Sequence, residues 1–403
     1  MKIQSLALFA ILPIAALSLS GCGKEPAAVK VGENGLSKIK VGYIGLTCEA
    51  PLFMAQEKGF FKEEGLEAEM VKCEWSKYKD VLALGGFDIT HHLIMMFLKP
   101  LEQGLNVRFT GGVHTGCLRV QTSTESTLKT AQDLKGKRIG VPGQMTPPMI
   151  FATRWLNDNG VDAGKDIEWK VYPAGELGLA LEKGEVDAIA DAEPIGTMLV
   201  AGGKVRNLAD QAKDAPYKDE YCCAVIANGK WADSNPDLCA RATRAILKGA
   251  KWVQTNPAAA AREAVEKKYL GSNPELNTSA IANLNYMPSI DGCHKAMGTA
   301  ATAMQKAGML DAGTNIDELV GKGWLPMPGI TDQWLGELKV EKVAMGQIPP
   351  DQEQRLLAEL AVTSDNLVVA TCCSKASKVV QAKPPETKIA QANEGATEIV
   401  LPR

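Results

Sequence analysis

Short strand-like runs alternate with helical patterns along most of the 403-residue chain, and this alternation constrains the fold more than any other feature. In the first part of the chain, strands are expected at 38–46, 66–71, 87–90 and 107–113, with helices between them. Strands separated in this way by helices pair in parallel and are covered by those helices. The sequence therefore predicts an α/β lobe with a mostly parallel sheet.

A second run of alternation follows the Ser/Thr-rich stretch 122–130 and predicts a second α/β lobe. Its expected strands are 138–141, 167–172 and 186–190. After a further strand at 221–227, the pattern up to residue 306 is helical. Two such lobes leave a cleft between them, and folds of this kind bind small molecules at the carboxyl ends of their strands.

The N-terminus has the pattern of a cleaved export signal. A positive start, Met1-Lys2, precedes an apolar stretch that ends in Leu19-Ser20-Gly21-Cys22, which resembles a bacterial lipobox. The pattern predicts a lipoprotein signal peptide over 1–21, lipidation of Cys22 and a tether over 22–37. We expect a lipid-anchored, extracytoplasmic protein, in the periplasm or on the outer face of a bacterial cell. The alternative is an ordinary secretory signal in which the cysteine has no role.

Cysteine content is the unusual part of the composition. The chain has ten cysteines, although a chain of this length needs no disulfides to stabilise its core. If Cys22 carries lipid, an odd number remains, so at least one thiol does not pair within the chain. These thiols therefore need a chemical role.

The charge pattern excludes one class of partner. The formal net charge is −3, and no basic run exceeds two residues. Such a chain has no electrostatic footprint for nucleic acid. After the N-terminus, no apolar stretch is long enough to span a bilayer.

Four segments together resemble ABC-transporter solute-binding proteins of the nitrate, sulfonate, taurine and thiamine-pyrimidine group. The segments are 54–66 (MAQEKGFFKEEGL), 133–142 (DLKGKRIGVP), 184–189 (GEVDAI) and Asn235-Pro236. The resemblance covers 38–328 and implies a two-lobed periplasmic-binding-protein type II (Venus-flytrap) fold with a helical C-terminal portion. It implies an ABC permease and ATPase as partners, closure of the lobes on a small solute by a hinge motion, and no enzymatic activity.

The implied domains follow from the same resemblance. Lobe one would comprise 38–122 and 222–330, and lobe two 123–221. The weaker pattern after residue 331 predicts a partly disordered C-terminal extension over 331–403.

A second set of segments resembles the binding-protein component of selenocysteine-assisted organometal (Sao) transport systems. The segments are 45–51 (GLTCEAP), 90–96 (THHLIMM), 112–119 (GVHTGCLR) and 220–224 (EYCCA). Some members of that family carry selenocysteine where others carry cysteine, and every such position is cysteine here. The resemblance implies a thiophilic metal or organometal, such as organomercury, as the ligand.

The residues that follow predicted strands are expected at the cleft. They are Thr47, Cys48, Glu49, His91, His92, His114, Cys117, Met145, Thr146, Glu193, Cys222 and Cys223. Sulfur and imidazole recur among them, which is typical of a site for a soft cation. We predict Cys48, Cys117, Cys222 and Cys223 as metal ligands. Strand alternation would turn only one of the last two toward the cleft.

The other cysteines show weaker evidence of a ligand-binding role. Cys73, Cys239 and Cys293 fall on a strand end and in predicted helices, where cysteine usually packs as a small apolar residue. The pair Cys372-Cys373 lies in the tail and could capture ligand or form a disulfide. No Cys-x-x-Cys motif is present, so a thioredoxin-type motif and a zinc knuckle are not supported.

Three functions remain in competition. The first is a lipid-anchored receptor of an ABC importer for a soft metal or organometal. The second is a receptor for a sulfonate, nitrate or thiamine-precursor pyrimidine, against which the scarcity of arginine at the cleft argues modestly. The third is an enzyme, because relatives that make the thiamine pyrimidine carry a cysteine cluster on this fold. A run of only two cysteines and export from the cytoplasm argue against the enzyme. No cofactor is expected.

Overall fold

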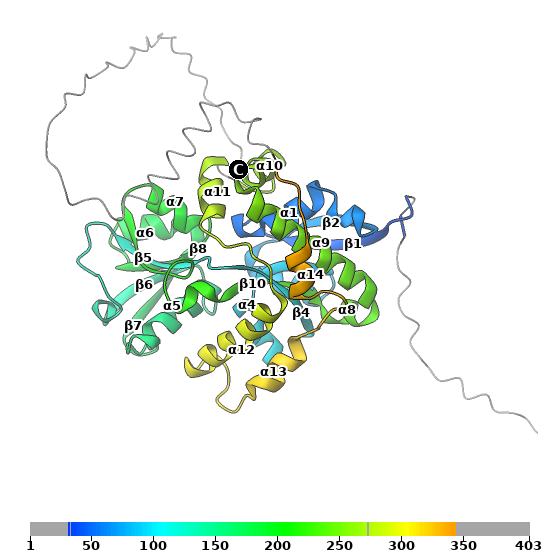
Figure 1. The fold of residues 1–403 in the computed structure, drawn as a ribbon. Coiled ribbons are helices and arrows are strands. Elements are labelled where there is room, and N and C mark those ends of the chain that lie inside the picture. Colours follow the sequence, from blue (N-terminus) through cyan, green and yellow to red (C-terminus); the bar gives the residue numbers. More distant parts are fainter. Residues whose placement is uncertain (1–30, 33, 272–273, 344–403) are drawn as a thin grey trace, which may run out of the picture. The chain divides into compact units, whose positions relative to one another are not determined.

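The computed structural model describes residues 31–32, 34–271 and 274–343 (Figure 1). Its first sheet, sheet A, has the strand order β2-β1-β3-β10-β4. Its strands are β1 (Ser37–Tyr43), β2 (Leu66–Lys72), β3 (Ile89–Leu93), β4 (Val107–Thr115) and β10 (Tyr221–Asn228). Only β10 runs antiparallel to its two neighbours. Sheet A is thus mostly parallel, as expected.

The second sheet, sheet B, repeats this arrangement with the order β7-β6-β8-β5-β9. Its strands are β5 (Leu118–Ser123), β6 (Lys137–Val141), β7 (Ile167–Val171), β8 (Ala188–Ala192) and β9 (Val205–Asp210). Here β5 is the strand that runs antiparallel to both neighbours. In each sheet, the reversed strand is the one that enters from the other sheet. The predicted two-lobed α/β fold is confirmed.

Helices cover both sheets (Figure 1). The helices that belong with sheet B are α5 (Pro147–Asp158), α6 (Leu177–Glu182), α7 (Ile195–Ala201) and the 3-10 turns η3 (Gln132–Leu134), η4 (Ala174–Glu176) and η5 (Tyr217–Asp219). Those of sheet A are η1 (Thr47–Glu49), α1 (Ala50–Glu57), α2 (Phe60–Glu63), η2 (Trp75–Lys77), α3 (Tyr78–Ala83), α4 (Met95–Glu102), α8 (Gly229–Ser234), α9 (Pro236–Thr255), α10 (Pro257–Glu266), α11 (Pro274–Ala282), α12 (Ile290–Lys306), α13 (Ile316–Gly323) and α14 (Asp332–Glu337). We call sheet A with its helices lobe one, and sheet B with its helices lobe two.

Two predicted boundaries are wrong. Strand β5 belongs to sheet B, so the chain leaves lobe one at residues 116–117 and not at 122. Sequence patterns missed β5 and β9 because the polar residues within them resemble a loop. Residues 331–343 are also part of lobe one, because the Asp332 carboxylate accepts the backbone N–H of Ile290 and caps α12. The predicted signal peptide, most of the tether and the rest of the extension lie outside the described residues.

A glycine allows two helices of lobe one to approach each other closely. Helices α1 and α9 pack together, and a Cβ at Gly249 would lie 2.2 Å from the Pro51 carbonyl oxygen. Because that oxygen belongs to the backbone, a larger residue requires α1 to move. The absence of a side chain at this position therefore sets the distance between the two helices.

We expect Gly249→Ala to lower the free energy of unfolding by about 2 kcal/mol, since overpacking outweighs the better helix propensity of alanine. Urea denaturation measures the change. The matched control is Gly298→Ala on α12, where a Cβ would meet no atom within 4 Å. It should be neutral or slightly stabilising. Equal effects of the two substitutions would contradict the packing argument.

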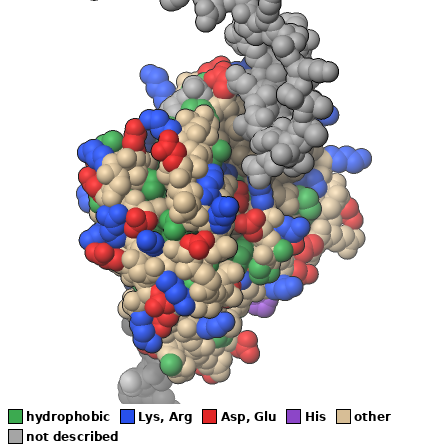
Figure 2. All heavy atoms as spheres, turned by 90° about the vertical axis from the view of Figure 1, so that its left-hand side faces the viewer, with side chains coloured by type: hydrophobic (Ala, Val, Ile, Leu, Met, Phe, Trp, Pro, Cys, Tyr) green, Lys and Arg blue, Asp and Glu red, His purple; other side chains and the backbone are tan. Residues whose placement is uncertain are grey.

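Charged side chains of both signs are interspersed on the face shown in Figure 2, which is the left-hand side of Figure 1, where lobe two lies. Several form exposed ion pairs, such as Lys204 with Glu182 and Lys165 with Asp162. This face therefore presents no strong field of one sign. No helix among the described residues is long and apolar enough to cross a membrane.

Candidate functional site

Topology brings the predicted sulfur and imidazole residues to one edge of sheet A. Cys48 follows β1, His91 lies near the end of β3, and Cys117 follows β4. Strand β10 runs in the opposite direction, so its first residues reach the same edge. Those residues include Cys222 and Cys223. Segments from four parts of the chain therefore meet, because the carboxyl ends of the parallel strands and the start of the antiparallel β10 share one edge.

The four predicted thiol ligands form a compact group, which we call the thiol cluster (Cys48, Cys117, Cys222 and Cys223). The Cys222 Sγ lies 3.5 Å from the Cys117 Sγ and 3.6 Å from the Cys223 Sγ. The sulfur atoms of Cys48, Cys117 and Cys223 all lie within 4.8 Å of one another. Sulfurs at such separations can share one metal ion, since a typical zinc–sulfur bond is about 2.3 Å.

Two imidazoles border the thiol cluster. Nitrogen atoms of His91 and His114 lie with the Cys223 sulfur in a group whose members are within 4.8 Å of one another. The His114 Nδ1 is 3.5 Å from the Cys222 Sγ. Both ring nitrogens of His91 and the Nε2 of His114 are buried without a hydrogen-bond partner among the described residues. Buried nitrogens of this kind normally have a partner, so their arrangement suits a metal ion.

Both vicinal cysteines join the cluster, which corrects the expectation that alternation turns only one of them inward. The pairing of β10 with β4 shifts register between Tyr221 and Cys223 and again between Cys223 and Ala224. Such irregularities interrupt regular alternation in a strand. The bulged start of β10 therefore places the sulfurs of Cys222 and Cys223 on the same side.

The cluster is buried, and its electrostatics differ from thiol to thiol. Hydrogen bonding among the thiols, together with burial, raises the pKa of Cys48 and of Cys117 to about 11. Burial opposes ionisation of Cys222, but hydrogen bonds with Cys117 and Cys223 lower its pKa to about 6. Burial lowers the pKa of His91 well below its usual value and keeps this ring neutral, the form that binds metals. Burial raises the pKa of Cys223 well above its usual value, so one thiolate, three thiols and a neutral imidazole lie together in one site.

The thiol cluster lies beside the cleft and does not line it. The cleft has a volume of about 750 Å³ and includes residues of both lobes, among them Leu46, Trp75, Gln144 and Asp191. None of the four cysteines is among its lining residues. Instead, Cys117 lies in the connection from β4 to β5, and Cys222 lies at the start of β10, where the returning connection ends. All four cysteines are buried, so they do not face the open cleft in this structure.

Two other predicted ligand contacts have structural partners instead. The Glu49 carboxylate accepts the backbone N–H groups of Ile44, Gly45 and Leu46 and so closes the loop after β1. Burial and the nearby Cys48 raise its pKa to about 8. The Thr47 hydroxyl donates to the Asn277 Oδ1 at 2.6 Å. Both side chains fix the position of Cys48 rather than present a free group.

The other predicted ligand contacts lie in different places, some at the cleft and one in the core. Glu193 and Thr146 line the cleft, while Met145 lies in an adjoining pocket. His92 points away from His91, as expected for neighbours in a strand, and packs edge-on against the rings of Trp75 and Tyr78. It is therefore a core residue.

Sequence patterns missed several residues near the site. Tyr286 packs its ring against His114, with 5.0 Å between ring centroids, and donates its hydroxyl to the Thr47 carbonyl. Trp75 and Lys79 line the cleft from η2 and α3. No local pattern marks them, because only the packing of distant segments brings them there.

The other cysteines agree with a packing role where they are described. Cys239 and Cys293 are buried within α9 and α12, and Cys73 is half-buried after β2. The seven described cysteines are all free thiols. Cys22, Cys372 and Cys373 lie outside the described residues.

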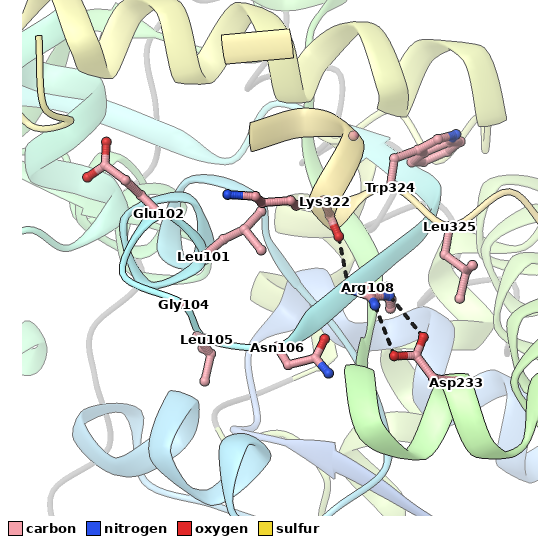
Figure 3. Close-up of a pocket in the computed structure, with 11 residues that line it drawn as sticks. Leu101, Glu102, Gly104, Leu105, Asn106, Arg108, Asp233, Lys322, Trp324 and Leu325 are labelled. Carbon is pink, nitrogen blue, oxygen red and sulfur yellow. Dashed lines mark hydrogen bonds and ion pairs between the residues drawn. The ribbon is translucent and has the colours of Figure 1, made fainter. Parts of the chain in front are cut away.

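A second pocket on lobe one, of about 620 Å³, shares no lining residue with the cleft (Figure 3). Arg108 on β4 donates to both carboxylate oxygens of Asp233 on α8 and to the Lys322 carbonyl (Figure 3). Because its arginine is engaged by the protein itself, this pocket has the features of a structural junction.

Two five-stranded mixed sheets, each with one reversed strand from the other lobe, define the class of periplasmic-binding-protein folds. The nitrate-binding protein NrtA from Synechocystis superposes with a TM-score of 0.62 at 18% identity, covering 82% of this chain and 100% of that chain. A ligand-binding component of an ABC-type import system from Staphylococcus aureus, solved with zinc bound, gives 0.60 at 17% identity, covering 75% and 99%.

Sequence comparison places the chain in a family. A model described as the NMT1-like family matches residues 32–267, more than half of the chain, and the chain belongs to this family. The bicarbonate-binding protein CmpA from Synechococcus is 24% identical over 279 residues, which cover 58% of this chain and 60% of that protein. The chain thus matches somewhat less than two thirds of the length of that curated relative.

Proposed function

We propose that the chain is the extracytoplasmic solute-binding component of an ABC importer and not an enzyme. Family membership, the two-lobed fold and relatives named as binding proteins support this function. A permease and an ATPase would be its partners, and lipid on Cys22 would hold it at the membrane. Solute would be held where the two lobes meet.

We propose further that the ligand is a thiophilic metal ion or organometal held by the thiol cluster. The observation that carries this proposal is the convergence of four buried thiols with unpartnered nitrogens of His91 and His114. Thiolate and imidazole are ligands preferred by soft cations such as mercury(II), copper(I) and zinc. Since Cys117 lies in one crossing and Cys222 lies at the start of β10, where the other crossing ends, a shared ion would also link the segments about which the lobes move.

Calorimetric titration of the fully reduced protein with mercury(II), in the presence of a competing small thiol, tests this assignment. We expect one site of micromolar or tighter affinity. A hundredfold excess of ligand over its dissociation constant should stabilise the fold by about 2.7 kcal/mol. A titration with no heat beyond that of the competing thiol would refute a metal as the ligand.

Binding should release protons. Because the pKa values of Cys48 and Cys117 are about 11, both are protonated at neutral pH and must lose a proton to bind a metal. Affinity should therefore rise with pH, by about tenfold per pH unit for each such thiol, up to their pKa. Calorimetry in two buffers of different ionisation enthalpy counts the protons. Release of none at pH 7 would contradict thiol ligation by these two residues.

The alternative is an oxyanion such as nitrate, bicarbonate or a sulfonate, or a thiamine-precursor pyrimidine. The names of the relatives favour it. The charges in the cleft oppose an anion, since Glu74, Asp191 and Glu193 line it with Lys79 as its basic residue. Thermal-shift measurements with nitrate, bicarbonate, taurine and an aminopyrimidine separate the two ligand classes, because a strong response to any of them supports the alternative.

A further inference from the structure

A carboxyl group without partners lines the cleft. Asp191, on β8, is 1% exposed, and neither of its carboxylate oxygens accepts a hydrogen bond within the described part of the chain. Glu193, two residues later, is different, because it accepts hydrogen bonds from the Thr197 backbone and hydroxyl. Buried carboxylates are costly unless paired, so Asp191 is a buried acid of this cleft that lacks a hydrogen-bond partner among the described residues.

The nearby Arg119 does not supply a hydrogen bond to the Asp191 carboxylate. Arg119 forms an ion pair with Glu193, and its Nε lies 3.5 Å from the Asp210 carboxylate. Three buried acids, Asp191, Glu193 and Asp210, thus surround one guanidinium, which leaves two negative charges in excess when all are ionised. Burial raises the pKa of Asp191 well above its usual value, so a cation in the cleft would stabilise its ionised form.

The size and walls of the cleft indicate an organic ligand. A volume of about 750 Å³ is far larger than a bare ion requires. Apolar side chains form much of its wall: Leu46, Trp75, Met96, Pro142, Pro148, Pro173, Leu177 and Ile195. An organic group can pack against these residues while a cationic group faces Asp191.

The cleft and the thiol cluster are neighbours through the backbone. Glu193, in the cleft wall, donates its backbone N–H to the Cys117 carbonyl at 3.2 Å. On the other side, Leu46 lines the cleft two residues before Cys48. A ligand in the cleft is therefore next to the thiols.

We propose that the cargo enters as a soft metal ion complexed by a small organic thiol that carries a cationic amine, and that Asp191 binds the amine. This inference rests on the proposed metal-binding function. A cluster thiol would then replace the small thiol: a protein sulfur–metal bond forms, the metal–sulfur bond of the carrier breaks, and the proton of the protein thiol passes to the released carrier. The metal keeps its oxidation state throughout.

Two mercury(II) complexes of nearly equal size test the proposal: the bis-cysteamine complex carries amines, and the bis-2-mercaptoethanol complex carries hydroxyls. At low carrier concentration, we expect the apparent affinity of the wild-type protein for mercury(II) to be at least about tenfold higher with the cysteamine complex than with the 2-mercaptoethanol complex. A tenfold difference corresponds to about 1.4 kcal/mol, which one ion pair would supply. Asp191→Asn should remove this preference and leave uptake from the hydroxyl complex unchanged. Asp187→Asn is the matched control, because Asp187 pairs with Arg138 and is not a lining residue of the cleft.

The outcomes separate the two proposals. Equal uptake from both complexes by the wild-type protein refutes the role of Asp191 but not the proposed metal site. This comparison needs only the wild-type protein, so it holds even if Asp191→Asn does not fold. Uptake from neither complex overturns the metal-binding function itself. A preference that persists in Asp191→Asn assigns the amine to another residue and refutes this inference.

Discussion

Replacing Cys117 and Cys222 together with serine should lower the affinity for mercury(II) by at least about a thousandfold, or about 4 kcal/mol. These two sulfurs are 3.5 Å apart; Cys117 lies in the crossing from β4 to β5, and Cys222 lies at the start of β10, where the returning crossing ends. Serine keeps the size of the side chain but is a poor ligand for soft metals. Competition calorimetry against a small thiol measures the loss.

The chain supplies its own control for this experiment. Cys372→Ser with Cys373→Ser removes two cysteines that are adjacent in the sequence and should leave the affinity within about twofold, since a twofold change is only about 0.4 kcal/mol. Circular dichroism of both variants establishes that each is folded. Loss of tight binding in the tail variant, with retention in the variant of Cys117 and Cys222, would place the site in the tail and refute the assignment.

Arg119→Met should lower the free energy of unfolding by about 3–5 kcal/mol. The arginine side chain is only 4% exposed and its partner Glu193 is fully buried. Removing the guanidinium leaves Asp191, Glu193 and Asp210 as buried acids without a positive charge. Uncompensated buried charge is far more costly than the loss of an exposed pair. Urea denaturation at neutral pH gives the value.

Arg138→Met is the matched control. Arg138 also pairs with a carboxylate of lobe two, that of Asp187, but both side chains are about a third exposed. Exposed pairs contribute about 1 kcal/mol or less, so this variant should be close to wild type. If both variants lost the same stability, burial would not be the cause.

The stability of Arg119→Met should recover at acidic pH. Such a recovery would support the electrostatic reason, because protonation neutralises the remaining acids.

The fold followed largely from local patterns. Alternating strands and helices predicted both α/β lobes, and the strand at 107–113 was found two residues longer, as β4. Strands β5 and β9 could not be predicted because their polar residues are buried by partners from elsewhere in the chain. Arg119 and Asp210, which face each other across these strands, illustrate this point.

The site could be predicted only in part. The chemistry of Cys48, Cys117 and Cys222 was evident from their positions after or before predicted strands. Their burial beside the cleft was not, because it depends on packing between segments far apart in the chain. The hydrogen-bond partners of Glu49 and Thr47 could not be predicted either, since they are a neighbouring loop and the distant Asn277.

Sequence by itself determined the order of most strands and helices. With it came the edge of sheet A at which sulfur and imidazole accumulate, because strand direction fixes which loops share an edge. Tertiary structure decided everything that depends on distance between segments far apart in the chain. The bulges of β10 set both vicinal thiols on one side. The ion pairs of Arg119 with Glu193 and Asp210 left the buried carboxyl of Asp191 without a hydrogen-bond partner in the described part of the chain. Burial and electrostatics arise from such contacts, and no local pattern encodes them.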